Sequence, residues 1–154
     1  MIRAATAVLI ALAGPAQALS CLRPDPATSF ATASASDLPY LVMTGELTAP
    51  PASGTTEQQP VSILARLTGH GLTNAGFTVP YDGDVVLDVT CAGPWCGALP
   101  ASGPVVAFAR IDGPTPVIEM SACGGWLFPD PDRATLDLLT DCINGKACSP
   151  QPVQ

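Results

Sequence analysis

Val105-Val106-Ala107-Phe108-Ala109-Arg110-Ile111 is the stretch that decides the fold, because it is almost continuously apolar over the length of one strand. A strand with one wet face alternates apolar and polar residues, whereas a strand covered on both faces does not. The stretch therefore predicts a strand buried on both sides. Asp112-Gly113-Pro114 then predicts a turn into a second strand, Val117-Ile118-Glu119-Met120, which would form a hairpin with the first.

Three further strands are predicted nearer the N-terminus, each from apolar residues that recur at every second position. The first covers residues 40–47, and a loop rich in proline and small polar residues follows it at 48–60. The second covers 61–67 and is predicted to end near Thr68-Gly69-His70-Gly71, where two glycines indicate a turn or a bulge. The third covers 84–90, after a turn at Tyr81-Asp82-Gly83.

A helix is predicted on each side of the strands. Residues 25–34 begin with Asp25 as N-cap and Pro26 in the first turn, and the C-terminal helix begins in the same way with Asp130 and Pro131. The second helix is predicted to end at Asn144-Gly145, with one apolar side made of Ala134, Leu138, Leu139, Cys142 and Ile143. The predicted fold class is mainly β, a small closed or partly open barrel of about five strands with a short N-terminal helix and a C-terminal helix.

The N-terminus has the features of a secretory signal peptide. Arg3 precedes an apolar stretch at residues 4–13, and Ala16-Gln17-Ala18 is a small-x-small cleavage site. We therefore expect a signal peptide at 1–18, one domain at 19–148, a disordered tail at 149–154, and a protein exported to the periplasm or the medium. An alternative is a lipoprotein, because Ala18-Leu19-Ser20-Cys21 loosely matches the site at which a cysteine is acylated.

The cysteines and the charges limit the classes of function. An even number of cysteines in an exported chain predicts three disulfides, although residue counting leaves their pairing open. The six cysteines are Cys21, Cys91, Cys96, Cys123, Cys142 and Cys148. The chain has six basic and thirteen acidic residues, and the basic ones are scattered, which argues against nucleic acid as a partner. We expect no transmembrane segment in the mature chain, and a monomer.

The residues that could carry chemistry favour a protein without catalysis. His70 is the only histidine and no Gly-x-Ser-x-Gly motif is present, so we predict no catalytic residue, no cofactor and no metal ligand. The acidic groups lack the EF-hand spacing and are interpreted as caps and solvated side chains. These are Asp82, Asp84 and Asp88, and Asp130, Asp132 and Asp137. Trp95, between two cysteines, could anchor a partner, whereas we expect Trp126 to cover an end of the barrel.

Four short segments resemble one known family. They are Cys21-Leu22-Arg23-Pro24-Asp25-Pro26 with Phe30, then Tyr40–Gly45, then Cys96-Gly97 about ten residues before Val105–Ala109, and finally Met120-Ser121-Ala122-Cys123. In this order the chain resembles the N-terminal, netrin-like domain of the tissue inhibitors of metalloproteinases and its bacterial look-alikes. The resemblance spans most of residues 19–145 and implies an OB-fold barrel with flanking helices.

The resemblance also implies a disulfide pairing and a partner. It pairs Cys21 with Cys123, which leaves Cys91 for Cys96 and Cys142 for Cys148. In the family, an earlier cysteine at the mature N-terminus chelates the zinc of the target through its amine and carbonyl groups. This chain has Leu19 at that place, which could offer the same atoms but is not held by a disulfide, and lost preorganisation weakens binding.

Taken together, these features predict an exported binding module that contacts another extracytoplasmic protein, with a metalloprotease as the candidate suggested by the resemblance. The predicted contact residues are Leu19, Ser20 and Trp95, with the 48–60 loop beside them. The alternative is a structural or lipid-anchored envelope protein without inhibitory activity.

Overall fold

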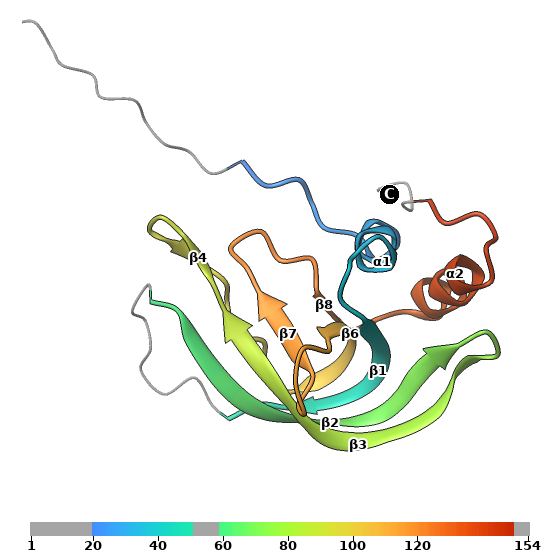
Figure 1. The fold of residues 1–154 in the computed structure, drawn as a ribbon, viewed down its shortest axis with the longest axis horizontal. Helices are drawn as coiled ribbons and strands as arrows, with labels where there is room; N and C mark the ends of the chain where they lie inside the picture. The colour runs from blue at the N-terminus through green and yellow to red at the C-terminus, as the bar shows by residue number, and fades with distance from the viewer. Residues whose placement is uncertain (1–19, 51–58, 150–154) are drawn as a thin grey trace, which may run out of the picture.

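The computed structural model describes residues 20–50 and 59–149 (Figure 1). The predicted signal peptide, Leu19, residues 51–58 of the predicted loop and residues 150–154 of the predicted tail lie outside this part of the chain. The elements in chain order are α1 (Pro26–Ser34), β1 (Tyr40–Thr48), β2 (Val61–Thr73), β3 (Gly76–Val89), β4 (Cys91–Ala92), β5 (Trp95–Cys96), β6 (Gly103–Arg110), β7 (Val117–Met120), β8 (Leu127–Pro129) and α2 (Arg133–Ile143). Neither described helix is long and apolar enough to span a membrane.

Six strands form one curved sheet, which confirms the prediction of a mainly β fold. Their order is β1-β2-β3-β7-β6-β8, and β1 also pairs with β6, so five of the strands are connected in a ring. All of these pairs are antiparallel except β3 with β7, which run in parallel. The ring is irregular, because β6 and β7 share a single residue pair, Arg110↔Val117.

The predicted two-sided burial of β6 is confirmed. Val105–Ala109 are all buried, and alternate residues belong to two different core clusters. Val105, Ala107 and Ala109 face the cluster enclosed by the curved sheet. Val106 and Phe108 face a second cluster, to which α1 contributes Ala33 and α2 contributes Leu139. Figure 1 shows the two helices side by side on this face of the sheet. β6 is therefore the layer between the two cores.

The β2–β3 hairpin is longer than predicted. β2 does not end near Gly69–Gly71, and Tyr81-Asp82-Gly83 is not a turn but part of β3; the turn lies between Thr73 and Gly76. Gly71 does adjoin a bulge, because the register shifts between Gly71 and Leu72. Glycine occurs both in turns and where two backbones approach closely. Gly69 is an example of the second, because it lies against the backbone of β1.

Gly45 and Gly69 are where β1 and β2 approach most closely. The two residues are direct partners in the ladder. A Cβ atom added at Gly69 would overlap the carbonyl group of Thr44, and one added at Gly45 would overlap that of Thr68. The absence of both side chains therefore lets the strands coil tightly enough to bring β1 back to β6.

β7 and β8 differ from the sequence prediction. The predicted hairpin of β6 and β7 is confirmed only at its base, where Arg110 and Val117 pair antiparallel. The longer ladder of β7, four residue pairs from Val86↔Val117 to Val89↔Met120, is with β3. The six-residue connection after Arg110 contains two prolines, Pro114 and Pro116, and gives the chain enough length to cross to β3. β8 was not predicted at all, because it is only three residues long and ends in Pro129.

The helix ends are set by aspartate caps. Asp25 accepts a hydrogen bond from the Thr28 backbone N–H at 3.0 Å, as predicted. The N-cap of α2 is Asp132 rather than the predicted Asp130. The Thr135 backbone N–H donates to the Asp132 carboxylate at 2.7 Å and holds the pKa of that group below its ordinary value. Asp130 has a positive φ of 49°, a conformation in which it cannot cap the helix.

The buried side of α2 also needs one correction. Leu139 and Cys142 are buried as predicted, whereas Ala134 is exposed. Leu136 packs against the second core cluster in its place, three residues before Leu139. The helix ends at Ile143, before Asn144 and Gly145, as predicted.

Three disulfides stabilise the fold, one between distant segments and two within short ones. The structure contains the pairs Cys21–Cys123, Cys91–Cys96 and Cys142–Cys148, which the resemblance implies. The first joins the segment before α1 to the chain just after β7, across 102 residues of sequence. The last turns the chain back after α2, so that the Cys148 sulfur lies 3.9 Å from the Ala27 carbonyl oxygen of α1.

Replacing Gly69 by alanine should destabilise the protein by about 3 kcal/mol, because the new methyl group has to displace the β1 backbone. Gly71→Ala is the matched control, since a Cβ there would meet only the Val79 carbonyl oxygen, at 3.8 Å. We expect the control to change the free energy of unfolding by less than about 1 kcal/mol. Urea unfolding of both variants measures the difference, and equal stabilities would contradict the close contact.

The disulfide that closes the longer loop should stabilise the fold more, because the loop entropy that a disulfide removes grows with the logarithm of loop length. On the chain-entropy estimate, removing Cys21–Cys123 with two serines costs about 4 to 5 kcal/mol, and removing Cys142–Cys148 in the same way costs roughly 2 kcal/mol. The second variant is the control for the first, because both remove one disulfide and add two hydroxyl groups. Urea unfolding under non-reducing conditions should rank them in this order.

Candidate functional site

The candidate site is the end of the sheet at which β3 and β7 stop. Past this end, the β4–β5 hairpin carries Trp95, and the segment after β7 carries Cys123 with its partner Cys21 (Figure 1). The Thr90 N–H donates to the Met120 carbonyl at 3.1 Å, and the Gly97 N–H donates to the Thr90 carbonyl at 3.0 Å. These bonds connect the base of the hairpin to the strand end from which the disulfide starts.

Gly97 makes this connection close. A side chain at this position would overlap the Met120 carbonyl group, so only glycine lets the base of the hairpin lie against the end of β7. Cys96 precedes Gly97 and Cys123 follows Met120 by three residues. The Cys91–Cys96 and Cys21–Cys123 disulfides therefore both lie within a few residues of the contact between Gly97 and Met120.

The segment Ser20–Arg23 forms one side of the site. All four residues are exposed, and Leu22 is 92% exposed. The segment is fixed at Cys21 by the disulfide, and Pro24 packs beside Gly124 and Gly125 on the chain that follows Cys123. An exposed leucine on a restrained backbone can enter an apolar pocket of a partner at a low cost in entropy.

Trp95 forms the other side of the site. It pairs with Ala92 across the two-residue turn of the hairpin, and it is 41% exposed. Trp126 differs from it, because its ring stacks on Tyr40 with centroids 5.0 Å apart and packs against both core clusters. Trp126 is partly buried and covers both clusters, in keeping with the expectation that it is a covering residue, and Trp95 is the more exposed of the two tryptophans.

His70 and the acidic residues lie elsewhere. His70 is exposed within the last third of β2, opposite Thr44 and Pro80, and not in the predicted turn. Asp88 accepts a hydrogen bond from the Ser62 hydroxyl at 2.7 Å, and Asp137 forms an ion pair with Arg133 one helical turn away. Within residues 20–50 and 59–149, no three His, Cys, Asp or Glu side chains are grouped so that they could hold a metal ion.

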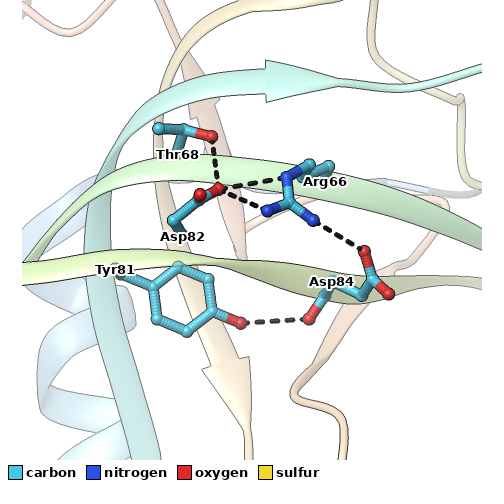
Figure 2. Close-up of polar contacts among 5 residues, drawn as sticks. All are labelled: Arg66, Thr68, Tyr81, Asp82 and Asp84. Carbon is cyan, nitrogen blue, oxygen red and sulfur yellow. Dashed lines mark hydrogen bonds and ion pairs between the residues drawn. The ribbon is translucent and has the colours of Figure 1, made fainter.

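Arg66 organises the aspartates on the outer face of the β2–β3 hairpin (Figure 2). Its guanidinium lies 2.9 Å from the Asp82 carboxylate and 3.6 Å from that of Asp84. The Thr68 hydroxyl donates to Asp82 at 2.9 Å. Both donors, Arg66 first, hold the pKa of Asp82 below its ordinary value. All of these groups are exposed to solvent, so the cluster has the character of a surface ion pair.

Tyr81 protects an edge of the sheet, a role that the sequence analysis missed. The part of β3 before Val86 pairs with β2 on one edge, and its other edge has no strand partner among the described residues. The Tyr81 hydroxyl donates to the Asp84 carbonyl at 3.0 Å, as Figure 2 shows, and its ring lies over Gly83. Partial burial raises the pKa of this hydroxyl. Pro80, without an N–H group, adds to the protection.

Two of the three predicted contact residues belong to segments attached at the same end of the sheet. Ser20 precedes Cys21, which is bonded to the chain after β7, Trp95 lies in the hairpin after β3, and Leu19 lies outside the described residues. Leu22 was not predicted as a contact, although its position between Cys21 and two prolines could have indicated it. Comparisons with protein-family models, curated proteins and solved structures found no match to this chain. The function is therefore argued from the geometry of this site.

Proposed function

We propose that this chain is an exported, non-catalytic binding module, with a netrin-like OB barrel, that contacts another extracytoplasmic protein through Ser20–Arg23 and the Trp95 hairpin. The observation that carries the proposal is the covalent fixing of both segments at one end of the sheet. Each segment presents one exposed apolar side chain, Leu22 or Trp95, beside a disulfide. Rigid, exposed apolar groups of this kind are typical anchors of protein interfaces.

The strand order supports the barrel assignment. The pairing β1-β2-β3-β7-β6 and back to β1 is compatible with a partly open Greek-key barrel of five strands, in which β7 is the fifth strand and β6 the fourth. The two helices and the Cys21–Cys123 pair agree with what the resemblance implies. Export is supported by the signal-like residues 1–18 and by the three disulfides.

The mode of contact proposed here differs from zinc chelation. Position 19 is a leucine, so no disulfide at this residue can anchor the mature N-terminus. The restrained part of the segment begins at Cys21, and Leu22 follows it. If the partner is a metalloprotease, we propose that Leu22 and Trp95 occupy apolar pockets on its surface and supply the binding energy.

Capture experiments with the mature protein test this surface. We expect the wild type to retain a protein from the envelope or medium of the exporting cell, and Trp95→Ala and Leu22→Ser each to weaken that binding at least tenfold, since anchors contribute about 2 kcal/mol or more. Leu64→Ser is the control, because Leu64 is 59% exposed on β2 and outside the site. Retention of the same protein by all three variants would contradict the proposed surface.

The intact mass of the mature protein separates the binding module from the lipid-anchored alternative. We expect a chain that starts at Leu19 and lacks six hydrogens because of three disulfides. A lipoprotein would start at an acylated Cys21, whose sulfur could then not be bonded to Cys123 as it is in the structure. Detection of that mass would replace the proposal with an envelope-anchored role.

A further inference from the structure

A hollow of about 710 Å³ lies between the first residues of β1, the last residues of β2 and the C-terminal ends of both helices. It is on another part of the molecule from the Trp95 hairpin, since none of its lining residues comes from Ser20–Arg23 or the Cys91–Cys96 segment. Most of its wall is apolar. The main apolar contributors are Phe30, Ala33, Val42, Leu72, Val79 and Ile143.

The hollow exists because β1 and β2 separate. Their ladder begins at Met43↔Gly71, so Tyr40–Val42 pair with β6 alone and β2 continues to Thr73 without β1 beside it. The bulge after Gly71 bends this last part of the hairpin. The separation is built into the register and the bulge, so the hollow is a fixed feature of the fold.

The size and the wall of the hollow suit a small apolar ligand. Ligand sites in proteins have volumes of about 300 to 1,000 Å³ and mostly apolar walls with a few polar groups. Leu38 and Val79 at the rim are 42% and 54% exposed. Three of the residues that line the hollow also pack against the second core cluster, which holds them in place: Phe30, Val42 and Leu72.

The polar groups at the mouth favour a positively charged end on that ligand. Asp37 is the one charged residue among those that line the hollow, and it is exposed. The Pro39 carbonyl accepts a hydrogen bond from the Ile111 N–H at 2.9 Å, on the β6 side of β1. Because successive carbonyls of a strand point to opposite sides, the Tyr40 carbonyl points toward the side of the hollow. A primary ammonium group, with three donors, matches a carboxylate and carbonyls.

We propose that the hollow binds a small cationic amphiphile, with an alkyl chain along Phe30, Val42 and Leu72 and a primary ammonium group at Asp37. The excess of thirteen acidic over six basic residues disfavours an anionic ligand of the same shape. The site is separate from the protein-binding surface proposed above. It gives the module a second ligand of a different chemical class.

Three probes with the same chain test the chemistry of the ligand. Decylammonium, decanol and decanoate are titrated below their micellar concentrations into the mature protein at pH 7, with calorimetry as the readout. We expect decylammonium to bind, decanol to bind more weakly, and decanoate to bind at least tenfold more weakly than decylammonium. Absence of decylammonium binding, or equal binding of all three probes, would overturn the proposal.

Two pairs of variants locate the binding. Asp37→Asn should weaken decylammonium binding about two- to fivefold, the range of an exposed ion pair, and should leave decanol binding unchanged. Glu46→Gln is its control, since it removes one exposed carboxylate from β1 outside the hollow. Leu38→Ser should weaken both probes, whereas Leu64→Ser should weaken neither. If a control variant has the same effect as its partner, binding occurs elsewhere and the proposal fails. Thermal unfolding of each variant verifies that it is folded.

Discussion

The two-sided burial of β6 is the constraint on which the rest of the structure depends. A strand whose residues are apolar at successive positions has no face that it can turn to water. The curved sheet encloses Val105, Ala107 and Ala109, and the two helices cover Val106 and Phe108. One face of β6 must therefore be closed by the curvature of the sheet and the other by the helices. The position of α1 and α2 on the outer side of the sheet at β6 meets the second requirement.

The parts of the fold that depend on local pattern could be read from the sequence. Alternation identified β1, the first half of β2 and the last half of β3, and the apolar run identified β6. Aspartate before proline identified α1 correctly, but the same signal was misleading at Asp130, because Asp132 offers a second cap two residues later. The choice between two adjacent caps depends on the backbone angles of the connection, which the sequence pattern does not contain.

The remaining differences come from interactions between segments that are distant in sequence. In the sequence, Gly69 indicates the end of a strand, whereas in the sheet it lies inside β2 and pairs with Gly45. Val117–Met120 looks like half of a hairpin until β3 supplies a parallel neighbour. In the site, Trp95 is exposed because it lies in a short hairpin closed by a disulfide, and the spacing of Cys91 and Cys96 in the sequence could indicate that hairpin. The contact of Gly97 with Met120, and the separation of β1 from β2 that forms the hollow, require the assembled sheet.

The hairpin that carries Trp95 leaves the sheet and returns to it at almost the same point, because the Gly97 N–H donates to the carbonyl of Thr90. The six residues from Cys91 to Cys96 thus form an appendage whose two ends are clamped by a disulfide and by the backbone below it. Such an arrangement makes the sequence of the hairpin largely independent of the folding of the sheet. Residues between the two cysteines can be inserted or exchanged while the strands beneath keep their register, which is the property sought in a framework for displaying engineered peptides.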